Sequence, residues 1–294
     1  MDRVLVERVR RFNRTVTQRI GALDDAYLSR GRPLGQARLL WEIAGDTCEL
    51  RDLRTRLDLD SGYLSRLLTA LRADGLVEVG QDGADGRVRT VRLTAAGLAE
   101  RAELDRLSDE LATSILRPLD DDQRERLTSA MAQVERLLVA SMVDVTVRDP
   151  AEPGARRCVA AYVAELAGRF DGGFDPERSL PAADDELRPP AGLLLVAALH
   201  DDPVGCGALK LRADGIAEVK RMWVAPSVRG LCLGRRLLTE LERHARAHGV
   251  HTLRLETNRA LTEAIALYRG AGFREVDAFN DETYAHHWFE KGLP

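Results

Sequence analysis

Apolar residues in the first part of the chain recur at the three- and four-residue spacing of amphipathic helices. The first stripe consists of Leu5, Val9, Phe12, Val16 and Ile20. Further helices are predicted near residues 37–44 and 50–57, and Asp60 is a suitable N-cap for a leucine-rich helix over 61–75. Two short helices followed by a hairpin are typical of a winged helix-turn-helix, whose second helix enters the DNA major groove.

The predicted hairpin consists of strands at 76–79 and 87–93, joined by the glycine-rich segment 80–86. Two longer apolar stripes follow at helical spacing, at 104–115 and 127–142. A small domain that already has a wing does not need both stripes for its own core. We therefore expect them to form the interface of a homodimer, and the alternative is that they form an intramolecular core.

The second part of the chain alternates between strand and helix patterns. Strands are predicted at 144–148, 193–199, 204–211, 219–224, 253–257, 273–279 and 284–289, and helices at 155–170, 229–248 and 260–269. The segment 171–190 has no periodicity and is rich in proline, glycine and acidic residues. The pattern predicts a multidomain chain: a mainly helical winged domain at 1–143, then an α+β domain at 144–294 with a mixed, mostly antiparallel sheet.

Composition adds a few limits to this picture. A length of 294 residues favours two domains, and a net charge of −4 argues against general affinity for polyanions, although one basic face would still bind DNA. The four cysteines form no CxxC pair, so we expect a reducing, cytoplasmic compartment. The charged N-terminus does not resemble a signal peptide, and the longest apolar run is too short to cross a membrane.

The stretch 218–236 carries the most specific chemistry. A short strand ends at Ala225-Pro226, and the glycine-containing turn 229–234 leads into a helix that begins with arginines. Unpaired backbone N–H groups at such a junction bind anions, and guanidinium groups add charge-assisted hydrogen bonds. The spacing matches neither the phosphate loop of nucleotide hydrolases nor the dinucleotide-binding turn of redox enzymes. We expect a diphosphate here.

Arg229, Gly234 and Arg235 resemble motif A of the GNAT acetyltransferases, which holds the pyrophosphate of acetyl-CoA. Cys232 stands where that family usually has its middle glycine, which stiffens the turn. The segment 260–273, ALTEAIALYRGAGF, is similar to the family's final motif, and Tyr268 takes the place of its helical tyrosine. The resemblance implies that the cofactor is acetyl-CoA and that no metal is needed.

The resemblance also implies roles for individual residues. The backbone of Met222, Trp223 and Val224 would pair with the cofactor, and the turn Arg229, Gly230, Leu231, Cys232, Leu233, Gly234 and Arg235 would hold its pyrophosphate. Tyr268 would protonate the leaving thiolate, unless it is only a core anchor. Glu218 would be the general base, unless it is a surface carboxylate; His200, His286 and His287 are its rivals. Asn258 binds the cofactor or caps the following helix.

Residues 34–97 resemble the MarR family of regulators, through LSRLLTALRADGLV at 64–77, the Asp85-Gly86-Arg87 tip and the 93–97 close of the wing. The resemblance implies a homodimer that binds a pseudo-palindromic duplex through Ser61, Gly62, Tyr63, Ser65, Arg66 and Arg87. The hypothesis is a transcriptional regulator fused to an enzyme that acetylates a primary amine of a small molecule or a protein. The alternative is a regulator whose second domain only senses acetyl-CoA or a metabolite, without turnover.

Overall fold

The computed structural model describes residues 2–43, 47–82, 88–180 and 182–294. The chain divides into two compact units, Met1–Ser129 and Ala130–Pro294. The division falls within the long helix α6 (Asp121–Ser141), whose residues 121–129 belong to the first unit and 130–141 to the second. The functional boundary after residue 143 therefore stays a prediction, since it places the whole of this helix with the first domain.

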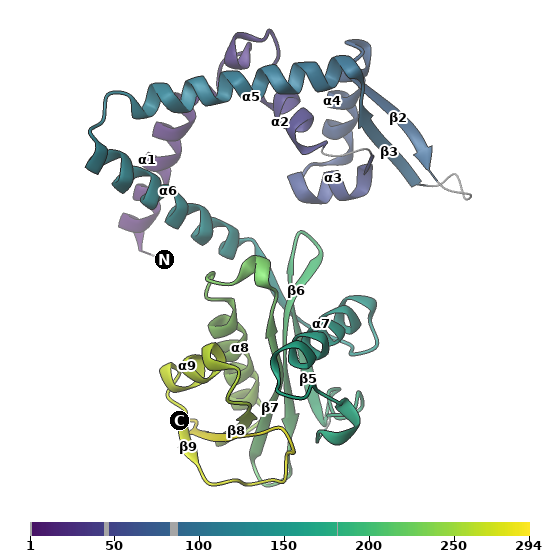
Figure 1. Ribbon diagram of the computed structural model, residues 1–294, viewed down its shortest axis with the longest axis vertical. Helices are drawn as coiled ribbons and strands as arrows, with labels where there is room; N and C mark the ends of the chain where they lie inside the picture. The colour runs from purple at the N-terminus through teal and green to yellow at the C-terminus, as the bar shows by residue number, and fades with distance from the viewer. Residues whose placement is uncertain (1, 44–46, 83–87, 181) are drawn as a thin grey trace. The chain divides into compact units, whose positions relative to one another are not determined.

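The first unit begins with α1 (Arg3–Arg19), followed by the 3-10 turn η1 (Tyr27–Ser29). Helices α2 (Leu34–Glu42), α3 (Leu50–Leu57) and α4 (Ser61–Ala73) come next (Figure 1). Asp60 caps α4 as predicted, because its side chain accepts a hydrogen bond from the backbone N–H of Tyr63 at 2.8 Å. Leu64, Leu67, Leu68 and Leu71 on one face of α4 are buried in the core of this unit.

The predicted wing is present as β2 (Val77–Asp82) and β3 (Val88–Leu93), which pair antiparallel. A two-residue strand that the sequence analysis missed, β1 (Cys48–Glu49), extends this sheet to the order β1-β3-β2. Thr94 then caps α5 (Ala95–Leu116) by accepting from the N–H of Gly97. A Cβ atom on Gly97 would lie 2.0 Å from the carbonyl oxygen of Leu76, so only glycine lets α5 start against the wing.

The long helices expose much of their apolar surface. Helix α1 buries none of its residues, and the side chains of Val4, Leu5, Val9 and Phe12 are exposed. In α6, Met131, Leu137 and Leu138 are exposed as well. On α5, in contrast, Leu104 is fully buried in the core of the first unit. The predicted interface stripe at 104–115 therefore begins with a core residue.

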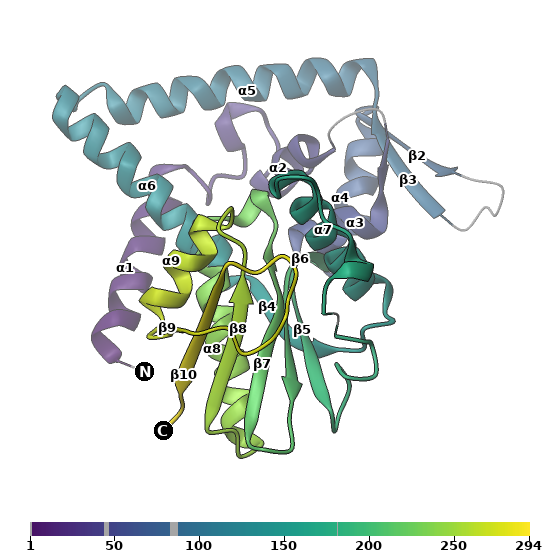
Figure 2. The same cartoon turned by 60° about the horizontal axis from the view of Figure 1, so that its bottom comes forward.

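The second unit contains a seven-stranded sheet in the order β4-β5-β6-β7-β8-β10-β9 (Figure 2). Its strands are β4 (Val143–Arg148), β5 (Gly192–Leu199), β6 (Asp202–Leu211), β7 (Ile216–Val224), β8 (Thr252–Thr257), β9 (Arg274–Val276) and β10 (His287–Gly292). The pair β7–β8 is parallel, and the other neighbours are antiparallel. The predicted mixed, mostly antiparallel sheet is confirmed.

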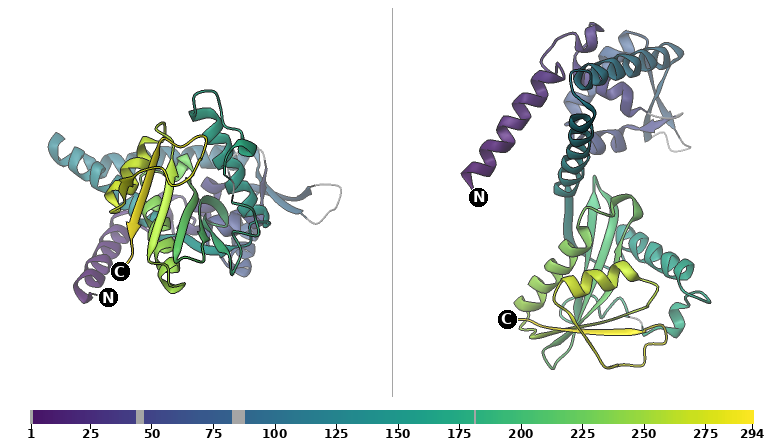
Figure 3. Two further views of the ribbon diagram at one scale, coloured as in Figure 1. Left: turned by 90° about the horizontal axis from the view of Figure 1, so that it is seen from below. Right: turned by 60° about the vertical axis from the view of Figure 1, so that its left-hand side comes forward.

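Helices cover both faces of this sheet (Figure 3, right). Alternating residues of β5 separate the two cores: Leu193 and Leu195 pack with α8 (Leu233–Ala247), whereas Leu194 and Val196 pack with α7 (Pro153–Arg169). Helix α9 (Thr262–Gly270) lies on the same face as α8, because its Ile265 and Tyr268 belong to the α8 core. The two short 3-10 turns η2 (Pro176–Arg178) and η3 (Pro226–Val228) complete the unit.

Several predicted elements have different bounds in the structure, and the strand predicted at 273–279 is reduced to β9 (Arg274–Val276). Helix α8 begins at Leu233 and not at 229, because Gly230 and Cys232 have φ angles of 82° and 58°, which a right-handed helix excludes. The last strand covers 287–292 and not 284–289, since Glu282 forms a turn in which its side chain accepts from the N–H of Tyr284 and its carbonyl from that of Ala285. Residues 282–285 thereby become a loop beside the sheet.

Candidate functional site

The parallel strands β7 and β8 separate partway along the sheet. They pair only at Ile216–Thr252, Ala217–Leu253 and Glu218–Arg254, although both strands continue for several residues. The β6–β7 register also shifts near Arg221, whose φ angle is 52°. The backbone of Met222, Trp223 and Val224 is therefore left without a β8 partner, and an extended ligand can pair with it there.

The predicted anion-binding turn joins β7 to α8. Cys232 is the residue before α8 and adopts a left-handed conformation, which costs a residue with a side chain about 1–2 kcal/mol relative to glycine. No side chain of the described residues caps the first turn of α8. Gly234 lies close to α9, because a Cβ atom there would be 3.2 Å from Leu267. The turn thus presents uncapped backbone N–H groups that suit an anion.

Two cavities that share part of their lining lie beside the C-terminal end of β7. The turn cavity, of about 460 Å³, is lined by Trp223, Arg229, Gly230, Cys232, Gly234 and Arg235, among others. The loop cavity, of about 250 Å³, is lined by residues of α7, of β7 and β8, and of the segments 174–180 and 282–285, and by Ala182, among others. Tyr162, Leu166, Met222, Leu261, Ala264 and Tyr268 line both. A molecule in one cavity can therefore meet a molecule in the other beside these side chains.

Tyr268 is buried at this junction, with 5% of its surface exposed. Burial raises the pKa of its phenol well above the usual value near 10, and the nearby Glu256 carboxylate raises it further. Tyr162 on α7 lies in a similar environment, where burial likewise raises its pKa. Both phenols are protonated at neutral pH and can donate a hydrogen bond or a proton. The sequence analysis identified Tyr268 but missed Tyr162, since nothing in the helical pattern of 155–170 distinguishes it from a core residue.

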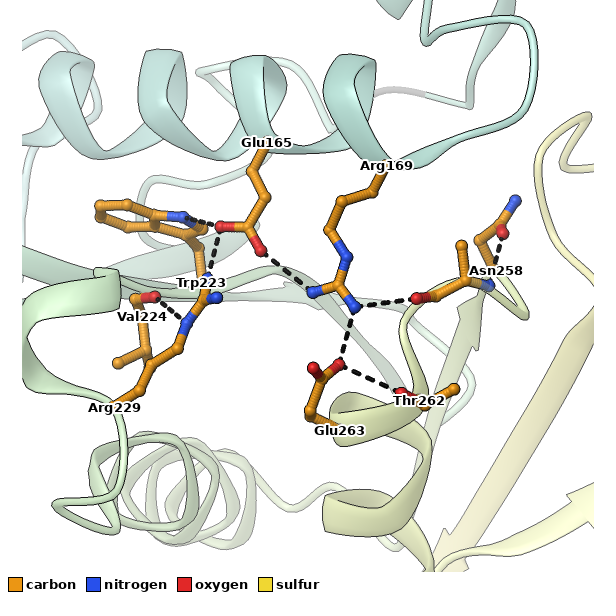
Figure 4. A network of polar contacts seen from close by, with 9 residues as sticks. Glu165, Arg169, Trp223, Val224, Arg229, Asn258, Thr262 and Glu263 are labelled. Carbon is orange, nitrogen blue, oxygen red and sulfur yellow. Dashed lines mark hydrogen bonds and ion pairs between the residues drawn. The ribbon is translucent and has the colours of Figure 1, made fainter.

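A network of ion pairs lies along the turn cavity (Figure 4). Glu165 on α7 accepts hydrogen bonds from the indole N–H of Trp223 at 2.9 Å and from the guanidinium of Arg229 at 2.5 Å. Arg229 also donates to the carbonyl of Val224 at 3.1 Å. Despite the opposing effect of burial, these hydrogen bonds hold the pKa of Glu165 below its usual range. The guanidinium of Arg229 therefore braces the turn against α7.

The network continues from Glu165 toward α9. Arg169 pairs with Glu165 at 3.2 Å and with Glu263 at 2.7 Å, and it donates to the carbonyl of Ala260 at 2.8 Å. The sequence analysis did not identify Glu165 or Arg169. Their spacing of four residues on a predicted helix was the available signal, because acid and base at that spacing form pairs.

The two arginines at the start of α8 have different surroundings. Arg235 is exposed and lines the turn cavity, and it takes part in no ion pair among the described residues. Arg236 instead donates to the carbonyl of Val143 at 2.6 Å and to that of Ala140 at 3.3 Å. Arg235 is thus the guanidinium available to an anion at the turn, whereas Arg236 stabilises the chain between α6 and β4.

Glu218 lies outside the linings of both cavities, so the structure does not place the predicted general base against a ligand. Its carboxylate is buried and pairs with Arg212 and, at 3.2 Å, with Lys220. Lys220 also pairs with Glu256, and both of these side chains line the loop cavity. The two carboxylates raise the pKa of Lys220 against the opposing effect of burial, so the ammonium stays charged. Glu218 can influence the cavity only through Lys220.

The buried amide of Asn258 is fully engaged within the protein. Its Nδ2 donates to the carbonyl of Tyr284 at 2.7 Å, and its Oδ1 accepts from the N–H of Ala260 at 2.9 Å. The second of these contacts closes a turn ahead of α9 and does not cap that helix, whose N-cap is Leu261 with no side-chain hydrogen bond. The predicted contact with the cofactor stays a prediction, since Asn258 lines the loop cavity and not the turn cavity.

The histidines do not form a site. His248 directs its Nδ1 to the carbonyl of His244 at 2.8 Å, and His287 pairs with Glu275. No cluster of three metal-binding side chains occurs among residues 2–43, 47–82, 88–180 and 182–294. His200 and His286, the other two rivals for the base, do not line either cavity.

The first unit has its own candidate interface, beside the predicted recognition helix α4. A depression of about 570 Å³ is lined by Ser61 and Ser65 and by four basic side chains that the sequence analysis did not select: Arg51, Arg54, Arg72 and Arg89. Arg66 lies over the ring of Tyr63, with 5.6 Å between its guanidinium carbon and the ring centre. Gly62 lies in the first turn of α4. Arg87, the sixth predicted DNA-binding residue, is outside the described residues.

This basic face fits the backbone of a nucleic acid, because guanidinium and hydroxyl groups are the usual partners of phosphate oxygens. The arginines were missed because they come from three separate elements, α3, α4 and β3.

Every helix in the described part of the chain is too short or too polar to span a lipid bilayer.

Comparison with known proteins identifies both parts of the chain. The profile of the acetyltransferase (GNAT) family matches residues 160–273, and that of the MarR family matches residues 30–88. An IAA acetyltransferase of Azospirillum brasilense is 41% identical over 123 residues, which cover 41% of this chain and 80% of that protein. YjgM of Escherichia coli K12, an uncharacterized N-acetyltransferase, is 39% identical over 129 residues, which cover 40% of this chain and 76% of that protein.

A solved structure of a GNAT-family acetyltransferase from Staphylococcus aureus Mu50 has a TM-score of 0.45 and 16% identity. It covers 52% of this chain and 99% of its own.

Proposed function

The chain belongs to the GNAT family of N-acetyltransferases and carries a MarR-family region, and from this premise we propose that it transfers the acetyl group of acetyl-CoA to a primary amine and binds duplex DNA as a homodimer. The observation that carries the catalytic part is the meeting of two cavities at Tyr268 and Met222. A two-substrate transfer needs such a junction, because the reacting atoms must approach to about 3–3.5 Å.

The turn cavity fits acetyl-CoA. Its uncapped N–H groups and the unpaired guanidinium of Arg235 would bind the pyrophosphate. The backbone edge from Met222 to Val224 would pair with the amide-containing arm, which then leads to the junction. Arg229 would act by holding the turn in place, since its guanidinium already pairs with Glu165.

In the proposed reaction the neutral amine attacks the carbonyl carbon of the thioester. A C–N bond forms, the C–S bond breaks, and the nitrogen loses one proton. Tyr268 donates its proton to the departing sulfur, and the raised pKa of its phenol keeps that proton available. Backbone N–H groups along Met222 to Val224 would stabilise the charge on the carbonyl oxygen.

The proton from the amine would pass, through water, to Glu256, which lines the loop cavity. Lys220 holds this carboxylate in place, and Glu218 in turn holds Lys220. Glu218 therefore enters the proposal as a positioning residue and not as the base that contacts substrate.

The DNA-binding part of the proposal is supported by the basic face beside α4 and by the exposed apolar surface of α1. A second copy that covers α1 would form a dimer with two recognition helices, which suits a pseudo-palindromic duplex. We place the boundary between the regulatory and catalytic parts after residue 143.

The test is a panel of primary amines supplied with acetyl-CoA, read by the release of free CoA. We expect turnover with at least one small amine. Acetyl-CoA binding that changes DNA affinity, without turnover on any amine or protein acceptor, would instead favour a ligand-sensing regulator.

A further inference from the structure

The loop cavity contains a buried carboxylate that no cation neutralises. Glu282 lines the cavity and is 9% exposed. It accepts hydrogen bonds from the hydroxyl of Ser179 at 2.9 Å, from the N–H of Leu180 at 2.6 Å and from that of Tyr284 at 3.2 Å. No Lys, Arg or His among the described residues lies within 4.0 Å of its oxygens.

The other charged side chains of this cavity are already paired or anchored. Glu256 pairs with Lys220, and the guanidinium of Arg221 donates to the carbonyl of Ala182 at 2.7 Å. Arg221 is partly exposed and also lines a neighbouring depression that contains Asp184, so solvent screens its charge. Glu282 is therefore the one described carboxylate of the cavity whose charge is buried without a counter-cation, and buried charges usually have partners.

Three aromatic rings surround the same end of the cavity. Phe170, Phe174 and Tyr284 all line it and pack against one another, with ring centres 4.9–5.8 Å apart. The faces of such rings attract cations, most strongly where water is excluded. A carboxylate beside aromatic rings is a suitable environment for an ammonium group.

Glu282 and these three rings line only the loop cavity and not the turn cavity. Tyr268 belongs to the shared part. The reacting nitrogen must be uncharged when it attacks and must lie at the shared end. A cation held at Glu282 is consequently a second group on the same acceptor molecule.

We propose that the acceptor is a small diamine, or another primary amine with a second cationic group, and that Glu282 determines this specificity by binding the distal cation. The inference rests on the proposed acetyl transfer. The volume of about 250 Å³ agrees with a small acceptor, since it is below the roughly 300–1,000 Å³ of most ligand cavities.

The experiment compares cadaverine with n-pentylamine, which has the same carbon chain and only one amino group. With the wild-type chain, kcat/KM should be about 10- to 150-fold higher for cadaverine, the effect of one hydrogen-bonded charge pair. Glu282→Gln removes the charge and retains one of the two oxygens that accept the hydrogen bonds of the loop, so this preference should disappear. Glu177→Gln is the control, because Glu177 is exposed in η2, close in sequence to the Ser179 that contacts Glu282, and does not line the cavity.

The wild-type comparison tests the proposal even if Glu282→Gln fails to fold. Equal kcat/KM for the two amines, or an unchanged preference in a folded Glu282→Gln, would overturn it. Calorimetry of cadaverine binding in the presence of CoA separates this inference from the proposed function. Weaker binding of cadaverine to Glu282→Gln, with no turnover by the wild type on cadaverine or on any other acceptor of the panel, would support the cation site and reject the transferase proposal, whereas equal binding would reject the site.

Discussion

The carboxylate of Glu165 on α7 and the guanidinium of Arg229 in the turn form an ion pair of 2.5 Å at the edge of the turn cavity. This contact joins residues 64 positions apart in the chain. It changes the expected role of Arg229, because its guanidinium holds the turn while Arg235 is available to an anion.

If Arg229 acts by pairing with Glu165, then Glu165→Gln and Arg229→Ala should weaken acetyl-CoA binding by similar factors. Each factor should be about 5- to 10-fold, because the ion pair is partly exposed. The double variant should bind no worse than either single variant, because residues that act as a pair are not additive. Calorimetry with acetyl-CoA provides the four affinities. A much larger loss in Arg229→Ala alone would show direct contact with the pyrophosphate.

Tyr268→Phe should retain the fold and the affinity for acetyl-CoA but reduce kcat by about 100- to 10,000-fold, the usual contribution of a general acid. Tyr162→Phe is the matched variant, because that phenol lines the same two cavities, although its side chain is only partly buried. Since burial raises the pKa of Tyr268, its proton should not be lost below about pH 10, and kcat should not fall through its ionisation between pH 8 and about 10. Steady-state kinetics across this range checks both points. A larger loss of kcat in Tyr162→Phe than in Tyr268→Phe would instead assign the donated proton to Tyr162.

Glu256→Gln should lower kcat/KM by about 100-fold or more if Glu256 receives the proton of the amine. Glu218→Gln leaves the lining of the cavity intact, so it should lower kcat/KM less and mainly destabilise the fold, by about 1–3 kcal/mol, through the loss of a buried partner for Lys220. Thermal unfolding and kinetics on both variants separate the two roles. A larger kinetic loss in Glu218→Gln, with a normal melting temperature, would restore Glu218 as the base.

Arg235→Ala should weaken acetyl-CoA binding by about 10- to 150-fold, since it removes the one described guanidinium of the turn cavity that is in no ion pair. Its neighbour provides the control. Arg236→Ala should leave this affinity unchanged and lower the free energy of unfolding by about 1 kcal/mol, because it removes contacts to the carbonyls of Val143 and Ala140. Equal affinities in both variants would exclude Arg235 as an anion ligand.

Arg54→Ala should weaken the salt dependence of binding to a DNA duplex of arbitrary sequence. The slope of the logarithm of the binding constant against the logarithm of the salt concentration should fall in magnitude by about 1, as expected when one phosphate contact is lost. Arg106→Ala is the control, because Arg106 pairs with Glu103 and Glu110 on α5. Changes at Tyr63 or Arg66 should alter the preferred sequence more than the slope, if these side chains reach base edges. Titrations by fluorescence anisotropy at several salt concentrations provide the slopes. Equal slopes for the wild type and Arg54→Ala would remove the depression from the DNA-binding face.

Local sequence determined the elements and the anion-binding turn, because periodicity, caps and glycines act over a few residues. Asp60 as a cap, the apolar strand at 193–199 and the turn at 229–234 all follow from such short-range rules. Tyr268 was identified by a different route, from the resemblance of the segment 260–273 to the final motif of the GNAT family. The predicted start of α8 at 229 was wrong, since only the observed backbone shows that Cys232 adopts the left-handed conformation that glycine usually provides.

Tertiary structure alone decided which charged groups line the two cavities. Glu218 and Glu256 both lie on predicted strands. In the structure Glu218 forms ion pairs with Arg212 and Lys220 away from the cavities, whereas Glu256 lines the loop cavity. Glu282 was one of many acidic residues in irregular segments until the chain brought it against Ser179 and Leu180, about a hundred residues earlier. The physical reason is that burial and ion pairing depend on neighbours distant in the sequence, so no local pattern records whether a carboxylate is solvated, neutralised or left for a substrate.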